Sequence, residues 1–509
     1  LGLHRGALAA AANHHRAHRR HQCMPVISAA LMSVASAVRV SRRVAVIGGG
    51  SGGVVAARFL KKAGHEPVLF EAGETFGGVW ADEPTNDVVY KHLQTNLPTV
   101  VMQSPDLDFA PGLPSYITKA QLGGYITAYA EAFGVAPMAR FGARVTRVSP
   151  LGEADGPASA AADDEGWRVE WTSGGTEQAA TFDAVVVANG HYEEPYEPSL
   201  PGEAEWLQAD PARTIVHSRR YDDPAEFRGR SVLVVGGRSS GVDISRALRG
   251  EAAWVYVLEK KCAAPISHEG EAVTHVPLGT RLCADGRLRV DGSGEAVAGP
   301  PVDAVVLATG YCYSFPFLDE EPLGMRFRGL RHVTPLHEHM LHASRPTLAF
   351  VGIPLAVPCP VPFFECQAAY IAEHLARPAG RAMTSEAERT AWLRRRMDAV
   401  GFDAGRPQDL HLTGAGGGCA WRYMRELLAA VHADAPPTAD GGSWLERPTW
   451  EARLATVEAV YRDRSARQPQ LPWHDDAYRR CEYTVDWTTG SWAVDDSRAR
   501  WPTAECEAA

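Results

Sequence analysis

Two glycine-rich turns are the features of this 509-residue chain that could carry chemistry. The first, VIGGGSGG (46–53), follows an apolar run and precedes a segment with helical spacing. Gly48 permits a sharp bend, Gly50 lets the backbone approach a pyrophosphate, and Gly53 lets the helix pack on the strand. The helix N-terminus then offers free N–H groups to the phosphates. Glu71 ends the next apolar run, where a carboxylate can bind ribose hydroxyls, so the pattern predicts a dinucleotide-binding β-α-β unit.

The second turn, VVGGRSSG (234–241), has its outer glycines at Gly236 and Gly241 but carries Arg238 at the middle position. A side chain there keeps the backbone farther from a pyrophosphate, although its guanidinium could contact phosphate instead. Glu259 has the same spacing from Gly236 as Glu71 has from Gly48. The pattern indicates a second dinucleotide, with a β-α-β unit that binds no ligand as the alternative.

The coenzyme of the second turn is indicated by the charges that follow its second strand. Glu259 favours a free 2′-hydroxyl, as in NADH. Lys260 and Lys261 follow at once, and two ammonium groups near a 2′-phosphate should outweigh one carboxylate. We therefore expect NADPH, bound in part by Lys260, with a modest preference over NADH. The alternative is that both lysines are merely solvated.

Composition and charge exclude several classes of function. The net charge of −10 and the absence of a basic patch argue against nucleic acid as a partner. The nine cysteines form no CxxC pair, so neither a zinc site nor a dithiol redox pair is expected. The most apolar stretch, residues 348–364, contains four prolines and is too broken for a transmembrane helix. A soluble intracellular protein is expected.

The N-terminal residues 1–42 lack acidic residues and are rich in arginine, histidine and alanine. This composition is typical of an organelle transit peptide, which would place the protein in a plastid or mitochondrion. The alternative is an untranslated or disordered leader on a cytoplasmic protein. Ordered structure should begin near Arg43.

Hydrophobic periodicity predicts the elements that position the two turns. Strands are expected at 44–47, 67–71, 184–190 and 304–310, a helix at 54–64, a pair of hairpin-like strands at 144–148 and 167–171, and a second β-α-β unit at 231–258. Residues 151–166 read as a surface loop, and 434–442 as a linker to a tryptophan-rich tail.

Beyond the first turn the chain resembles the flavin-containing monooxygenases, class B flavoprotein monooxygenases. The resemblance covers roughly residues 43–430, in family order. The segments that carry it are FEAGETFGGVW (70–80), YKHLQTNLPTVVMQSPDLDF (90–109), HSRRYDDPAEFRGRSVLVVGG (217–237), LATGYCYSFPFL (307–318) and FVGIPLAVPCPVPFFECQ (350–367).

The resemblance implies an α/β fold with two Rossmann-like dinucleotide-binding domains, the NADP domain inserted into the FAD domain. We expect a first FAD-binding part at 43–205, an NADP-binding domain at 206–300, a second FAD-binding part at 301–433 and a C-terminal extension at 434–509. FAD and NADPH are the implied cofactors. NADPH would reduce the flavin, dioxygen would form a C4a-hydroperoxyflavin, and a small amine or thioether would take the distal oxygen.

The same resemblance suggests site residues. Asn96 in LQTNLP is the one expected catalytic residue, because its amide can both donate to and accept from the flavin edge or the nicotinamide ribose; the alternative is an Asn that ends a helix before Pro98. The expected cofactor-binding residues are Gly48, Gly49, Gly50, Gly52, Gly53, Glu71, Gly78, Trp80, Thr95, Asn96, Val145, Gly236, Ser239, Gly241, Lys260, Thr309 and Gly310. No metal site is expected.

Three further residues have two alternative roles each. Glu365 and Gln367 are expected to open a helix, either aimed at the flavin or as a surface cap. His191 is expected to be structural or solvated.

One departure from the family concerns its identifying motif, FxGxxxHxxxY. His217 and Tyr221 are present, but Pro211 and Arg213 replace the Phe and the Gly. Baeyer–Villiger relatives carry Trp at the Tyr221 position, so Tyr221 argues against membership of that branch. LATGYCYSFPFL and LRHVTPL favour the N/S-oxygenating branch over the auxin-forming one.

Two other functions stay open. One is Baeyer–Villiger oxygenation of ketones. The other is a catalytically weak flavoprotein that binds a partner through its tryptophan-rich tail. The sequence indicates neither the substrate nor the oligomeric state.

Overall fold

The computed structural model describes residues 39–81, 88–152, 166–267, 271–292, 294–378, 382–433, 443–468 and 475–499. The expected leader at 1–42 lies almost wholly outside these residues. Most of the loop at 151–166 and all of the linker at 434–442 also lie outside them.

A seven-stranded sheet carries the first glycine turn. Its middle strands are apolar and nearly fully buried, which is typical of parallel strands covered on both faces. Its strands, in spatial order, are β18 (Leu336–His337), β19 (Leu341–His342), β20 (Leu348–Phe350), β7 (Ala184–Val187), β1 (Arg43–Ile47), β2 (Glu66–Phe70) and β3 (Ala139–Arg140). Strands β20, β7, β1, β2 and β3 run parallel.

A six-stranded sheet carries the second glycine turn. Its order is β12 (Ile266–Ser267), β13 (Val273–Val276), β11 (Trp254–Leu258), β10 (Ser231–Val235), β16 (Ala304–Leu307) and β9 (Thr214–His217), all parallel except β12. The chain enters this sheet after β7 and returns from it before β18. The two crossings pair with each other, because β8 (Glu194–Pro195) runs antiparallel to β17 (Tyr311–Cys312). The second sheet is therefore inserted between strands of the first.

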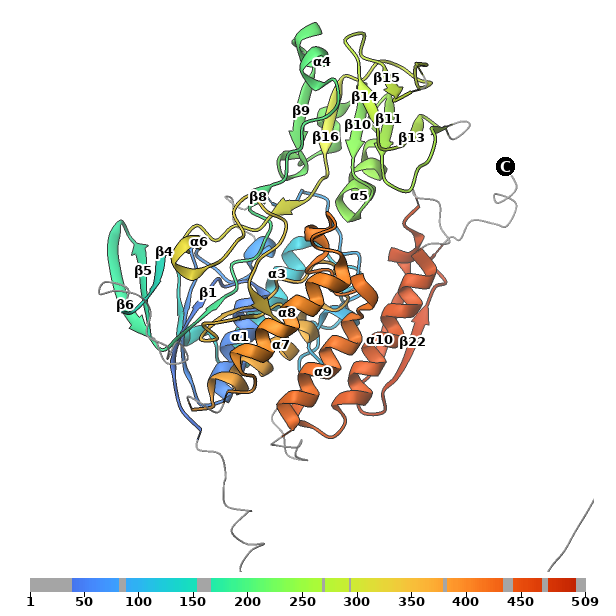
Figure 1. The fold of residues 1–509 in the computed structure, drawn as a ribbon. Helices are drawn as coiled ribbons and strands as arrows, with labels where there is room; N and C mark the ends of the chain where they lie inside the picture. Colours follow the sequence, from blue (N-terminus) through green and yellow to red (C-terminus); the bar gives the residue numbers. More distant parts are fainter. Residues whose placement is uncertain are drawn as a thin grey trace, which may run out of the picture. The chain divides into compact units, whose positions relative to one another are not determined.

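The described α-helices cover the sheets or follow them along the chain (Figure 1). They are α1 (Ser51–Lys62), α2 (Thr99–Met102), α3 (Lys119–Ala132), α4 (Glu203–Ala209), α5 (Ser239–Leu248), α6 (Glu320–Leu323), α7 (Pro360–Leu375), α8 (Glu386–Val400), α9 (Ala420–His432) and α10 (Trp450–Arg467). Helix α7 packs against both α1 and α9. The predicted helix at 54–64 is confirmed but begins at Ser51, directly after the glycine turn.

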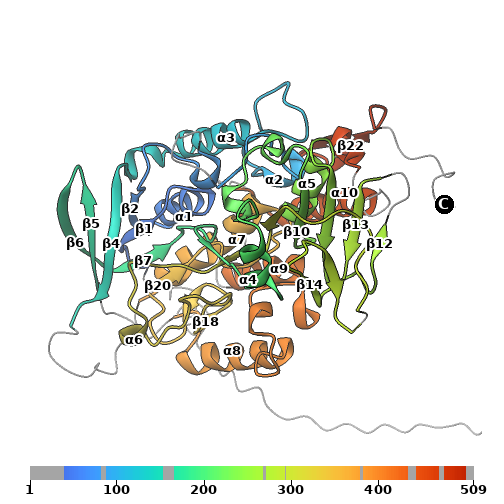
Figure 2. The same ribbon diagram turned by 90° about the horizontal axis from the view of Figure 1, so that it is seen from above.

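Three antiparallel strands form a separate layer beside β2 (Figure 2). They are β4 (Ala143–Pro150), β5 (Trp167–Ser173) and β6 (Thr176–Phe182), so the predicted hairpin-like strands are confirmed. Short antiparallel pairs are formed by β14 (Thr280–Leu282) with β15 (Leu288–Val290) and by β21 (Glu482–Asp486) with β22 (Ser491–Asp495).

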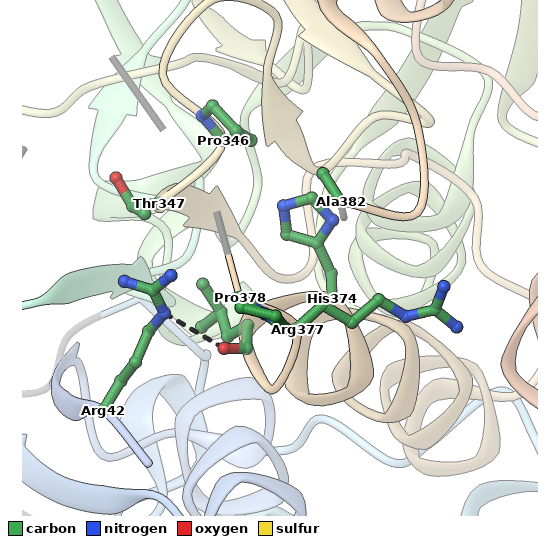
Figure 3. Close-up of a pocket in the computed structure, with 8 residues that line it drawn as sticks. Arg42, Pro346, Thr347, His374, Arg377, Pro378 and Ala382 are labelled. Atoms are coloured by element: carbon green, nitrogen blue, oxygen red, sulfur yellow. Dashed lines mark hydrogen bonds between the residues drawn. The ribbon is translucent and has the colours of Figure 1, made fainter. Parts of the chain in front are cut away.

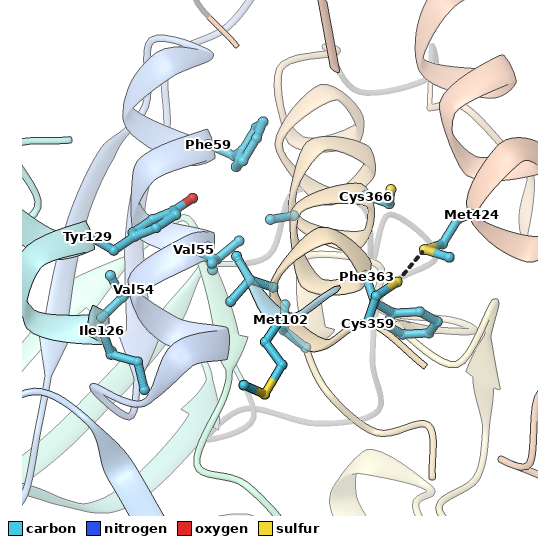
Figure 4. Packing of buried hydrophobic residues seen from close by; sticks show 14 of the residues in the cluster. Val54, Val55, Phe59, Met102, Ile126, Tyr129, Cys359, Phe363, Cys366 and Met424 are labelled. Carbon is cyan, nitrogen blue, oxygen red and sulfur yellow. Dashed lines mark hydrogen bonds between the residues drawn. The ribbon is translucent and has the colours of Figure 1, made fainter. Parts of the chain in front are cut away.

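The first sheet has a different apolar core on each face. Val44 and Val46 of β1 face the helices α1, α3 and α7, whereas Ala45 and Ile47 face the β4–β6 layer. The helical side is drawn in Figure 4, where the thiol of Cys359 on α7 lies 3.8 Å from the sulfur of Met424 on α9. Alternation along β1 thus fixes which layer covers which face.

The described part of the tryptophan-rich tail belongs to this same core. Trp444 is fully buried, and Trp450, Trp487 and Trp492 pack against the core while partly exposed. The Trp444 indole donates to Glu365 at 2.5 Å, and its backbone N–H donates to Asp106 at 2.9 Å. The tail is therefore tied to α7 by polar as well as apolar contacts.

Glu365 corrects an expectation from the sequence. Helix α7 begins at Pro360, and Glu365 and Gln367 are fully buried, so a surface cap is wrong. Glu365 pairs with Arg58 of α1 at 2.7 Å and accepts a hydrogen bond from the Tyr129 hydroxyl. Arg58 also pairs with Asp106 at 2.7 Å. A buried charge persists only when paired and hydrogen-bonded in this way.

Candidate active site

The first glycine turn joins β1 to α1 in a conformation that only glycine fits. Gly48 has φ +108°, and a Cβ there would lie 2.5 Å from the carbonyl oxygen of Ala188, just past β7. A Cβ on Gly53 would lie 1.8 Å from the carbonyl oxygen of Gly48. The turn therefore packs against its own sheet with no room for side chains, as a phosphate-binding turn requires.

The second glycine turn repeats this geometry. Gly236 has φ +123°, and its Cβ would lie 2.4 Å from the carbonyl oxygen of Ala308, just past β16. A Cβ on Gly241 would lie 1.7 Å from the carbonyl oxygen of Gly236. The middle residue, Arg238, has φ −101°, which any residue adopts, and its side chain is exposed. Arg238 thus leaves the turn intact.

Both turns can hold the phosphates of a dinucleotide. Each places the N-terminus of a helix, α1 or α5, at the carboxyl end of a central parallel strand. The first backbone N–H groups of such a helix have no partner within it and attract anions. At the first turn, a Cβ on Gly78 would lie 3.0 Å from the Cα of Gly50. A Cβ on Gly49 would lie 2.8 Å from the Glu71 carboxylate, a Cβ on Gly52 would lie 3.3 Å from the Val351 side chain, and Trp80 is partly buried.

The acid after each turn lies close to it. Glu71 accepts hydrogen bonds from the N–H groups of Gly49, at 2.5 Å, and Gly73, at 2.6 Å. Glu259 instead lies 2.7 Å from Nδ1 of His275 on β13. Lys260 is exposed, and no ion pair to it occurs among the described residues. The ammonium group of Lys260 thus stays available to an anion.

Asn96 connects the part of the site that carries the first glycine turn to the second glycine turn. Its Nδ2 lies 3.4 Å from the hydroxyl oxygen of Ser239, the first residue of α5. Its neighbour Thr95 is buried and pairs with the backbone of Ile117. The predicted catalytic amide therefore lies at the second turn, while Thr95 anchors its segment to the first half.

Thr309 and Gly310 lie where the chain leaves β16 towards the first sheet. The Thr309 hydroxyl donates to the carbonyl of Tyr196 on the opposite crossing at 2.5 Å. The carbonyl of Gly310 lies 3.0 Å from Nε2 of His217. His217 is buried, and its Nδ1 accepts from Arg219, so the surviving histidine of the family motif holds the Gly310 peptide in place.

Val145 is brought to the side of the first sheet that faces away from α1. It is largely buried and pairs with Trp171, beside a bulge between Val145 and Arg147. Its side chain belongs to the apolar core, so only its backbone remains for contact with a nucleotide.

Two features of the site were missed in the sequence. Tyr192 follows β7 on the crossing to the second sheet, and its ring contacts that of Tyr311 on the return crossing. Asp243 of α5 pairs with Arg479 at 2.9 Å. No sequence motif links the SGVDIS segment that holds Asp243 to the AYRRC segment that holds Arg479. The neighbouring His191, expected to be structural or solvated, is partly buried, and its Nδ1 lies 3.1 Å from the carbonyl oxygen of Gly352.

The pocket drawn in Figure 3 is not part of this site. It is lined by Arg42, just before β1, and by His374 and Leu375 at the end of α7. It thus lies at the amino end of β1, opposite the glycine turn. Within the described ranges no cluster of His, Cys, Asp and Glu is arranged to hold a metal ion. None of the described helices combines the length and apolar content needed to cross a bilayer.

Comparison with known proteins agrees with this geometry. Residues 41–272 match the family described as flavin-binding monooxygenase-like. The chain is 33% identical over 364 residues to flavin-containing monooxygenase FMO GS-OX-like 7 of Arabidopsis thaliana, covering 66% of this chain and 74% of that protein. It is 31% identical over 471 residues to the same plant's FMO GS-OX5, covering 86% and 92%.

A solved structure, the S-allyl-L-cysteine S-oxygenase from Allium sativum, matches with a TM-score of 0.69 at 26% identity over 86% of this chain and 96% of that one. The fold is therefore the mixed α/β fold with parallel sheets found in flavin monooxygenases. FAD and NADPH, the cofactors expected from the sequence, are those of the family that these matches define. The chain belongs to the flavin-containing monooxygenases, which are oxidoreductases.

Proposed function

We propose that this protein oxygenates the sulfur or nitrogen of small soft nucleophiles, using NADPH and dioxygen. FAD would be held at the first glycine turn by Gly48–Gly53 and Glu71. NADPH would be held at the second turn by Gly236–Gly241, Ser239 and Lys260. The observation that carries this proposal is the repetition of one turn geometry on two sheets of one chain, because two dinucleotides are needed to pass a hydride between them.

In this proposal the domain boundaries follow the chain crossings. A first Rossmann-like FAD domain comprises residues 43–205 and 301–433, and a Rossmann-like NADP domain of 206–300 is inserted into it. The described part of the segment 434–509 packs on the FAD part through Trp444. Because the described tail tryptophans lie in or against that core, they support a structural role over a surface for a partner.

The overall reaction balances with one molecule of NADPH and one molecule of dioxygen. NADPH, a proton, dioxygen and the substrate give NADP⁺, water and the oxygenated substrate. When bound, the reduced flavin supplies the activation of dioxygen. The chain itself contributes the Asn96 amide, which contacts the first residue of α5 at the second turn.

Sulfur is the preferred acceptor in this proposal. The Allium sativum structure with which the chain shares its fold is that of a cysteine thioether S-oxygenase. The cyclohexanone monooxygenase structure, at 16% identity, supports the shared fold alone. Tyr221 is present where Baeyer–Villiger relatives carry Trp, which also favours heteroatom oxygenation.

The test is product analysis with labelled oxygen. The purified protein, NADPH and ¹⁸O₂ are incubated with a thioether, a tertiary amine and a cyclic ketone in turn. One ¹⁸O atom in the sulfoxide or the N-oxide supports the proposal. Conversion of the ketone alone would establish the Baeyer–Villiger alternative, and NADPH oxidation that yields only hydrogen peroxide with every substrate would overturn oxygenation.

A further inference from the structure

A buried ion pair joins the C-terminal segment to the helix that begins at the second glycine turn. Arg479 donates to both carboxylate oxygens of Asp243, at 2.9 and 3.0 Å. The side chains are only 9% and 16% exposed. Both contacts come from one guanidinium nitrogen, Nη2, which lies between the two oxygens, and a charged contact of this kind is stronger than a neutral hydrogen bond. The pair therefore holds α5 in one position relative to residue 479.

Asp243 lies in the N-terminal half of α5, one turn after Ser239. It also accepts a hydrogen bond from Arg246 of the same helix at 3.1 Å, and from the Tyr90 hydroxyl at 3.3 Å. Tyr90 belongs to the segment that continues to Asn96. Burial, and then the negative charge of Asp243, raise the pKa of Tyr90, so its hydroxyl stays a donor.

The residues on either side of Arg479 are fixed to the first sheet's core. Ala477, Tyr478 and Cys481 are buried in that core. Two residues further on, the N–H of Tyr483 donates to the Ser115 hydroxyl at 2.7 Å. The backbone on both sides of Arg479 is therefore held by the core of the first sheet, which carries the first turn.

We propose that Arg479 is a positioning residue for hydride transfer: through Asp243 it holds α5 so that the second glycine turn faces Asn96 and the first turn. This inference rests on the proposed binding of NADPH at the second turn. A misplacement of about 1 Å between two reacting groups can slow a reaction roughly a hundredfold. A fixed position of α5 would therefore keep hydride transfer fast. The C-terminal segment thus completes the site although it contributes no group to either turn.

Arg480 offers a matched control. It is the next residue, and it also forms an ion pair, with Asp476 at 3.3 Å, but its side chain is 48% exposed. An exposed pair of this kind contributes little to stability. Arg479→Ala and Arg480→Ala remove the same charge from the same turn, so a difference between them reports on Asp243.

The experiment measures flavin reduction by saturating NADPH in a stopped-flow instrument. We expect Arg479→Ala to slow reduction at least about tenfold, with unchanged FAD content, while Arg480→Ala matches the wild type. Reoxidation of dithionite-reduced enzyme by dioxygen should be unchanged in both. Arg479→Lys keeps a positive charge beside Asp243 and should recover much of the lost rate, and Arg479→Ala should speed hydrogen exchange of the α5 amides before any NADPH is added.

The outcomes separate this inference from the proposed function. If the wild type itself is not reduced by NADPH, the proposed function fails. If the wild type is reduced and Arg479→Ala is reduced equally fast, with α5 exchange unchanged, then Arg479 has no positioning role. Failure of Arg479→Lys to recover any rate, with FAD still bound, would likewise overturn it.

Discussion

The amide nitrogen of Asn96 lies 3.4 Å from the hydroxyl oxygen of Ser239, although 143 positions separate them in the chain. Asn96 follows a segment anchored to the first half of the molecule through Thr95. Ser239 is the first residue of α5, at the second glycine turn. This contact connects the 90–109 segment to the N-terminus of α5.

Asn96→Ala should accept hydride from NADPH but oxygenate poorly. The amide can donate to one cofactor and accept from the other, so its loss leaves the oxygenating state less protected from water. We expect at least half of the consumed NADPH to appear as hydrogen peroxide, measured by a peroxidase-coupled assay alongside product yield. Gln94→Ala is the control, since it removes an exposed amide two residues earlier in the same segment. A product yield per NADPH equal to that of the wild type would end the assignment of Asn96.

Glu71→Ala should weaken FAD retention. The carboxylate holds the N–H groups of Gly49 and Gly73, and charged hydrogen bonds of this kind contribute about 1.5–3 kcal/mol each. Loss of one such contribution corresponds to a rise in Kd of roughly tenfold or more. Equilibrium dialysis of FAD against the apoprotein measures the change. Glu66→Ala, at the exposed start of β2, is the control. Equal FAD affinity in the two variants would show that Glu71 only shapes the turn.

Lys260→Ala should raise the KM for NADPH roughly tenfold and leave that for NADH nearly unchanged. The lysine is exposed, and its ammonium group attracts a 2′-phosphate, whereas Glu259 faces His275 with one oxygen, at 2.7 Å, and lies against Gly237 of the turn with the other. Initial rates with both coenzymes, with Lys61→Ala on α1 as an exposed control, measure the effect. A wild type that prefers NADH, or equal effects on both coenzymes, would show that Glu259 determines the specificity.

Much of the architecture could be predicted because it is encoded locally. Glycines at fixed spacing after an apolar run identified both turns, and the strands at 44–47 and 67–71 are observed as β1 and β2, shifted by one residue. Arg238 is interpreted from the sequence as a variation of the second turn. Its φ of −101° is open to any residue, so the turn does not require glycine at this position.

Long-range polar contacts could not be predicted in the same way. Glu365 resembles a solvent-facing acid until Arg58, more than 300 positions earlier, is known to lie beside it. Asp243 belongs to the predicted second β-α-β unit and Arg479 to the tryptophan-rich tail, and neither segment indicates that the other lies beside it. Burial of charge depends on which elements pack together, and apolar periodicity does not specify that packing in a chain of this length.

Glu365→Gln should destabilise the protein by about 3–5 kcal/mol, because it leaves the Arg58 guanidinium buried with less compensating charge. Urea unfolding followed by tryptophan fluorescence measures the change, and FAD should be added in excess to keep both proteins loaded. Glu373→Gln on the same helix is the control, since its pair with Arg377 is closer to solvent. A loss below about 1 kcal/mol would mean that the Arg58–Asp106 pair alone sustains the buried charge.

The stability of the protein should fall steeply below pH 6.5. Burial lowers the pKa of His337 and His342 to about 4, and of His374 and His411 to about 3. Unfolding returns each to an ordinary pKa near 6.5, so the unfolded chain binds more protons as the pH falls below 6.5, and the native state loses stability there. Glu338 acts in the opposite direction, because burial raises its pKa to about 7 and the native state then keeps a proton that the unfolded chain releases.

At pH 5 the four histidines and Glu338 together give a net uptake of about three protons on unfolding, or roughly 4 kcal/mol of stability lost per pH unit. Urea titrations between pH 7.5 and 5 measure this slope. His374→Asn should reduce it by about one proton, whereas His92→Asn should leave it unchanged, since the His92 side chain is 64% exposed. A free energy of unfolding that stays constant between pH 7 and 5 would mean that these histidines are not held neutral in the folded protein.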